Sequence, residues 1–185
     1  MRIIPGRLLR LKPEEALVPL YAANLLLIFH AFLVAYINSS FLGEYMPATA
    51  VSAVYTIGAA LTVIIFLLVS RVLRRVGNYQ LSMALLVANL VAVTGMAFAE
   101  SLRTAVPLFL VHLVTLPLLV FNLDVFMERI IGNNEGVTGS RRGLLLTPMS
   151  IVAAVAPCMG TQLMDGATNQ FTNAYLLSAA ILLPV

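Results

Sequence analysis

The sequence predicts an all-α integral membrane protein that folds as one bundle of six transmembrane helices. The first indication is composition: 61% of the 185 residues are hydrophobic, 10% are charged, and the mean hydropathy is +0.97. A soluble domain carries about 25% charged residues, because its surface is in water. The second indication is a series of long apolar segments, and the third is the regular alternation of basic residues between the breaks that separate them.

The apolar segments belong to a single membrane domain that covers residues 1–185. They are residues 17–37, 48–69, 81–99, 106–126, 144–164 and 171–185. A helix needs about 20 mostly apolar residues to cross the hydrocarbon core, and the first five segments come close to or exceed this length. The sixth has about 15 residues, which span about 22 Å as a helix. Because the sequence stops among apolar residues, we expect an amino-terminal fragment whose sixth helix is truncated.

The basic residues predict the orientation in the membrane. Of the 11 Lys and Arg residues, Arg103 alone falls on one side, and the others share the opposite side: Arg2, Arg7, Arg10, Lys12, Arg71, Arg74, Arg75, Arg129, Arg141 and Arg142. Short loops rich in Lys and Arg stay in the cytoplasm. The amino terminus is therefore predicted to be cytoplasmic. The protein is expected to cross the cell (inner or plasma) membrane several times, with the lipid bilayer around it as a partner.

The break between the second and third segments is short and basic, and residues 70–79 read SRVLRRVGNY. It is similar to the loop signature G-x-x-x-D-[RK]-x-G-[RK]-[RK] of the major facilitator superfamily. Arg75 and Gly77 match, whereas Ser70 replaces the first glycine, Arg74 replaces the acid, and the closing basic pair is missing. With its six segments, the chain resembles the amino-terminal half of such a transporter over essentially its whole length. The resemblance implies alternating access and a carboxy-terminal half that is not in this sequence.

The same residues also fit a simpler reading, a tight basic turn. Gly77 suits a chain reversal because glycine adopts positive φ without steric cost. Arg71, Arg74 and Arg75 would hold the turn at the anionic inner leaflet. Since Arg74 stands where the family has its acid, the charge contacts that the family's loop makes do not carry over to this chain.

The fifth segment contains A-P-C-M-G-T over residues 156–161. This stretch is similar to the G-P-x-x-G-G motif of drug/proton antiporters in the same superfamily, and Pro157 and Gly160 match. A helix kinked by proline, with a small residue at a helix contact, explains the pattern equally well.

Two histidines lie inside apolar segments, where ionisable groups are costly and usually face the bundle interior. His30 and His112 are each about 20 Å from the inner ends of the first and fourth segments at 1.5 Å per residue. Thr115 and Asn122 share a helix face with His112, and Asn24 lies on a small and polar stripe of the first segment. We predict that both rings face one interior cavity, where they hold a proton or a polar substrate. The alternative is two neutral histidines, each hydrogen-bonded to nearby groups.

An acidic pair, Asp124 and Glu128, lies near the inner end of the fourth segment. Like charges at i and i+4 disfavour a helix slightly unless a cation is near. The arginines of residues 71–75 lie on the same side of the membrane. We therefore predict a latch of ion pairs between these groups, with a solvated acidic pair as the alternative.

Three classes of function fit these features: a secondary transporter of an unknown small solute, a structural or regulatory membrane protein, and a membrane-embedded enzyme. The sequence lacks HExxH and G-x-S-x-G motifs, so an enzyme is the least favoured. No cofactor or metal is expected, because the lone Cys158 has no neighbouring ligand motif. No basic face with aromatic readers indicates nucleic acid binding. Proton coupling is compatible with the histidines, and transport is the leading hypothesis.

Overall fold

A computed structural model describes residues 13–131, 135–164 and 171–185. Over these ranges the chain is helical, without strands. The helices are α1 (Pro13–Ala35), α2 (Ile37–Gly43), α3 (Ala48–Val76), α4 (Asn78–Ala97), α5 (Leu102–Ile131), α6 (Glu135–Met164) and α7 (Thr172–Leu182).

Five of these helices are long and apolar enough to cross a membrane: α1, α3, α4, α5 and α6. They coincide with the first five predicted segments, so the prediction of a multi-pass helical membrane protein is confirmed at this level. The sixth segment forms α7, which has 11 residues and is apolar but short. A bundle of six full spans is therefore not established by helix length.

The polar breaks are more helical than the sequence predicted. After the first segment, the chain turns at Tyr36 and forms the short helix α2, because Phe41 and Leu42 are buried in the core. The basic stretch before Gly77 is not a loop but the last turns of α3. Arginine is a good helix former, and cations are favourable at the negative carboxyl end of a helix.

Gly77 is the single residue between α3 and α4, and it has φ 91° and ψ 155°. This positive φ confirms the predicted use of glycine for the reversal. The break before the fifth segment is also largely helical, since α6 begins at Glu135.

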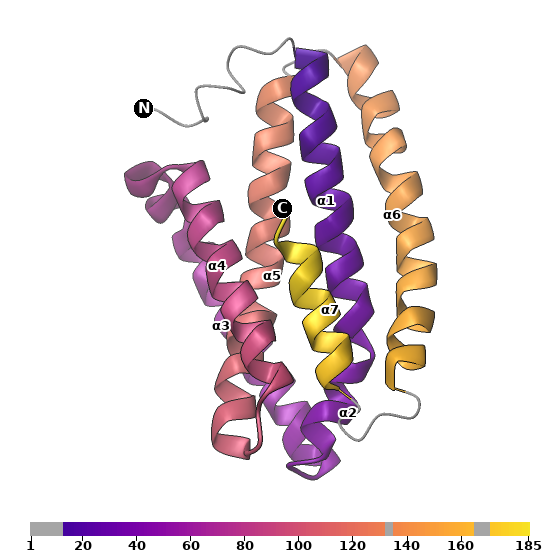
Figure 1. Ribbon diagram of the computed structural model, residues 1–185. Coiled ribbons are helices and arrows are strands. Elements are labelled where there is room, and N and C mark those ends of the chain that lie inside the picture. The colour runs from indigo at the N-terminus through magenta and orange to yellow at the C-terminus, as the bar shows by residue number, and fades with distance from the viewer. Residues whose placement is uncertain (1–12, 132–134, 165–170) are drawn as a thin grey trace.

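The long helices alternate in direction (Figure 1). Helices α1, α4 and α6 run one way, and α3, α5 and α7 run back. One end of the bundle therefore carries Arg71, Arg74, Arg75 and Arg129 and is called the arginine-rich end. The other end carries α2, the connection from α4 to α5 and the start of α7, and is called the α2 end (Figure 1).

The contacts among the six longer helices have a two-part pattern, with α1, α3 and α4 in one unit and α5, α6 and α7 in the other. If α1 is exchanged with α5, α3 with α6, and α4 with α7, the α4–α5 contact becomes the α7–α1 contact. In the same way the α1–α6 contact becomes the α5–α3 contact, and all four contacts are present. The α3–α4 contact becomes α6–α7, whereas α1–α5 and α4–α7 are each exchanged into themselves. Since the exchanged helices run in opposite directions, this contact pattern is the one expected of two three-helix units with inverted topology, and it is called the inverted repeat.

The core lies between α1, α4, α5 and α7, and α3 and α6 flank it on the outside. At the α2 end the core is aromatic and contains Phe41, Phe109 and Tyr175. Helices α3 and α6 expose large apolar side chains, among them Leu67 and Ile151. Such exposure would be costly in water but not in lipid, so these surfaces fit a membrane environment.

Candidate functional site

Five polar side chains converge in the interior of the bundle, at the junction of four helices. They are His30 of α1, Asn89 of α4, His112 and Thr115 of α5, and Ser178 of α7, and they are called the polar cluster. All five are buried, and His30, Asn89 and Ser178 are 0% exposed. An apolar bundle can hold such groups only when they satisfy one another's hydrogen bonds.

The ring of His30 is held by α7 on one side. Its Nδ1 atom lies 2.7 Å from Ser178 Oγ and 3.1 Å from the Ser178 carbonyl oxygen. The Ser178 hydroxyl also lies within donating distance of the His30 carbonyl oxygen, at 3.3 Å. These contacts fix both the ring of His30 and the rotation of α7 against α1.

The side chain of Asn89 bridges the two histidines. Its Nδ2 atom lies 3.1 Å from His30 Nε2, and its Oδ1 atom lies 2.8 Å from His112 Nδ1. The Thr115 hydroxyl is 3.2 Å from the same Oδ1 atom and 2.8 Å from the Val111 carbonyl oxygen. The imidazole rings themselves meet edge to face, with centroids 5.5 Å apart and an angle of 82°.

The partners assign the protons of the polar cluster. Since Nδ1 of His30 faces two oxygens, it carries the proton, and its Nε2 accepts from the Asn89 amide. The Asn89 carbonyl oxygen then accepts from Nδ1 of His112. Turning this amide over would exchange donor and acceptor toward both rings at once. The proton positions of the two histidines are thus coupled through Asn89.

Of the residues that the sequence singled out, His30, His112 and Thr115 come together. The depth argument is confirmed, because the two rings are in contact. Both rings contact Asn89 and each other, and the shared cavity stays a prediction.

The other two candidates, Asn24 and Asn122, are buried but lie outside the polar cluster. Among the residues that the structure describes, neither Oδ1 nor Nδ2 of Asn122 has a hydrogen-bond partner, and Oδ1 of Asn24 also has none. The backbone oxygen of Asn122 accepts a hydrogen bond from Asn78 at 3.0 Å. These amides therefore do not extend the polar cluster.

Sequence reasoning missed Asn89 and Ser178. Asn89 lies in the middle of the apolar run LSMALLVANLVAVTG. A polar side chain within an apolar segment is the feature by which His30 was chosen. It could therefore have been found as an intramembrane polar residue. Ser178 is too small and too common in helices to stand out in the same way.

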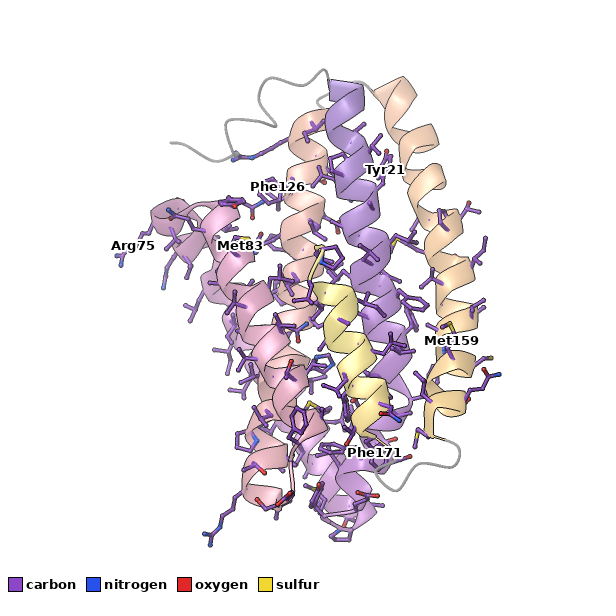
Figure 2. The ribbon with its side chains drawn as sticks, viewed as in Figure 1. Tyr21, Arg75, Met83, Phe126, Met159 and Phe171 are labelled. Atoms are coloured by element: carbon purple, nitrogen blue, oxygen red, sulfur yellow. The ribbon has the colours of Figure 1, made fainter. Side chains whose placement is uncertain are left out.

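The predicted loop-motif and latch residues lie at the arginine-rich end. Arg71, Arg74 and Arg75 are exposed, and Arg75 points outward from the tip of α3 (Figure 2). Asp124 and Glu128 are exposed on the carboxyl half of α5. The latch between these groups stays a prediction. Ser70 is an exposed residue of α3 and marks no separate loop.

In α6, Pro157 lies inside the helix, and Gly160 meets the backbone of α1. A Cβ added at Gly160 would collide with the carbonyl oxygen of Leu33. Gly160 is therefore a small residue at a helix contact, as the alternative to an antiporter motif predicted.

Within the described residues, no three His, Cys, Asp or Glu side chains gather closely enough to hold a metal ion. Comparison of the chain with protein-family models, curated proteins and solved structures gave no match.

Proposed function

We propose that this chain forms a helical bundle of a secondary active transporter that moves a small solute by alternating access. The observation that carries the proposal is the polar cluster. Its two histidines come from α1 and α5, the helices that the inverted repeat exchanges, and they meet inside an apolar bundle. In transporters built from inverted repeats, substrate and ion sites lie near the middle of the membrane at the interface of the repeats.

The architecture supports a relationship to the major facilitator superfamily. Each half of such a transporter contains two inverted three-helix repeats. The contacts of α1, α3 and α4 with α5, α6 and α7 follow this pattern. Alternating access needs a second bundle. Among the long helices, α3 and α6 are the least buried within this bundle, so their exposed faces are available to contact the second one. The arginine-rich end is cytoplasmic under the positive-inside rule.

The polar cluster would serve as the proton site of this transporter. Histidine takes up and releases protons near neutral pH more readily than any other side chain. A proton that arrives at Nε2 of His30 requires the Asn89 amide to turn, so that its oxygen accepts from His30 and its nitrogen faces Nδ1 of His112. The packing of α4 and α7 against α1 would respond, since both helices bond to His30.

A second candidate is a purely structural role for the polar cluster. Both ring nitrogens of His30 already have partners within the protein. A saturated polar contact can hold four helices in register without any transport. The two candidates differ in whether the histidines affect a solute-dependent proton flux.

The test measures proton movement in everted membrane vesicles that contain the full gene product. A pH gradient is formed by respiration and followed with a quenched acridine dye, and solutes are added from four classes: amino acids, sugars, organic cations and organic anions. A coupled transporter dissipates the gradient when its substrate is added. We expect His30→Ala and His112→Ala to shift the pH dependence of this response or to abolish it.

The matched control is Val87→Ala, an exposed change on α4 that leaves the polar cluster intact. It should behave as the wild type. The proposal is overturned if no solute class moves protons above vesicles without the protein. It is equally overturned if both histidine variants reach normal levels in the membrane and keep the wild-type pH profile.

A further inference from the structure

A cavity lies at the α2 end, away from the polar cluster. Its volume is about 400 Å³, and it is lined by Phe41, Glu44, Tyr45, Met96, Ala97, Phe98, Ala99, Glu100, Phe171 and Thr172. These residues come from α2 and the turn after it, from the end of α4, and from the start of α7. Phe171 lies at this end of the bundle (Figure 2). A volume of this size suits a small organic molecule.

The electrostatic field in this cavity is negative. The lining residues include the carboxylates of Glu44 and Glu100 and no basic side chain. Helix α4 ends at Ala97 and α2 ends at Gly43, so two helix carboxyl ends also lie at the cavity. The carboxyl end of a helix carries about half a negative charge. Burial, and then the charges of Glu44 and Glu100, raise the pKa of Tyr45.

Arg103 lies in the first turn of α5, is exposed, and does not line the cavity. The Tyr45 hydroxyl donates to the Ala99 carbonyl oxygen at 2.6 Å, and Thr172 donates to the Ala97 carbonyl oxygen at 2.9 Å. These two carbonyl oxygens are already engaged, so they are poor ligands for a bare metal ion.

Four aromatic residues are among those that line the cavity, and the accessible rings are those of Tyr45 and Phe98, because Phe41 and Phe171 are buried. Phe41 meets Tyr45 edge to face at 5.5 Å and Phe171 at 5.6 Å between ring centroids. Phe98 also lines the cavity and is 66% exposed. Ring faces attract cations, and alkylated ammonium groups are bound by aromatic walls of this kind because they are weakly hydrated.

We propose that this cavity binds a small organic cation whose ammonium group is alkylated. The two carboxylates supply the charge, and the accessible rings of Tyr45 and Phe98 supply a surface for the alkyl groups. A hydrated metal ion would not use such a wall, and an anion would be repelled. This site does not require the chain to transport anything, so it is tested by binding alone.

The experiment uses the full chain, purified in a neutral detergent, and two probes of the same shape. One is choline, and the other is 3,3-dimethylbutan-1-ol, in which carbon replaces the charged nitrogen. Binding is followed by saturation-transfer NMR titration. We expect saturable choline binding at least about tenfold tighter than that of the neutral alcohol. Raising the salt concentration should weaken choline binding, because both carboxylates are exposed.

Three variants locate the site. Glu44→Gln and Glu100→Gln should each weaken choline about threefold to fivefold and leave the alcohol unchanged. Phe98→Leu keeps an apolar side chain but removes a ring from an exposed position, so the fold should persist. It should weaken choline about twofold to fivefold. The matched control, Arg103→Gln, changes a charge at the same end outside the cavity and should not weaken binding.

Equal affinity for choline and the alcohol would overturn the proposal, because the cavity would then be only apolar. Absence of saturable choline binding below about 10 mM, an affinity weaker than about 3 kcal/mol, would also overturn it. Choline binding that all three cavity variants leave unchanged would place the cation elsewhere and overturn the site. Failure of transport in vesicles would leave each of these results unaffected.

Discussion

The imidazole rings of His30 and His112 meet edge to face with their centroids 5.5 Å apart, and one asparagine amide hydrogen-bonds to both. They belong to α1 and α5, which run in opposite directions and are exchanged by the inverted repeat. Asn89 and Ser178, which hold the rings, belong to α4 and α7, and these helices are exchanged in the same way. The polar cluster therefore joins the two three-helix units at their contact.

Replacing Asn89 by leucine should destabilise the protein by about 1–3 kcal/mol. Leucine has a similar volume, but it leaves a nitrogen of His30 and a nitrogen of His112 without partners in a site closed to water. The free energy of unfolding is measured by circular dichroism as the fraction of sodium dodecyl sulfate in mixed micelles is raised. Val87→Ala on the same helix is exposed and should change the stability by less than about 0.5 kcal/mol. A leucine variant as stable as this control would mean that the hydrogen bonds of Asn89 contribute nothing to the free energy of unfolding.

Gly160→Ala should weaken the packing of α6 on α1 and destabilise the protein by about 1–3 kcal/mol. The added Cβ would collide with the carbonyl oxygen of Leu33, and backbone atoms cannot move aside as a flexible side chain does. The matched control is Gly143→Ala in the same helix, where no atom lies within 4 Å of the added Cβ. That change should be neutral or stabilise by up to about 1 kcal/mol, because alanine favours helix. The same micelle titration measures both, and similar results for the two would exclude a close contact at Gly160.

The sequence predicted the long helices well, but it did not predict which side chains meet between them. Long apolar segments and rise per residue were enough to place His30 and His112 at one depth, since both depend only on counting along a helix. Which side chain fills the space between two helices depends on packing, so the role of Asn89 did not follow from the pattern. The helix α2 was missed because its burial rests on Phe41 packing against Phe171, a contact between distant parts of the chain.

The turn at Gly77 gives a third prediction. Its φ of 91° lies in a region that other residues enter only with strain, and it alone separates α3 from α4. Gly77→Ala should therefore cost about 1–3 kcal/mol of unfolding free energy. Gly43→Ala, at the end of α2, has open space around the new Cβ and a negative φ, and should be nearly neutral. If both variants unfold at the same detergent fraction as the wild type, the reversal does not depend on glycine.

The last prediction concerns the orientation of the bundle. The arginine-rich end carries Arg71, Arg74, Arg75 and Arg129, whereas the α2 end carries Glu44, Glu100 and Arg103. Because positively charged segments are retained in the cytoplasm, the α2 end should face outward. Single cysteines are introduced by Glu44→Cys, Glu100→Cys and Arg75→Cys after the exposed native thiol is removed by Cys158→Ser. A membrane-impermeant maleimide should label the first two in intact cells and the third only after the membrane is opened. Labelling of the Arg75 position from outside, with protection of both glutamate positions, would reverse the orientation. The cavity at the α2 end would then open to the cytoplasm.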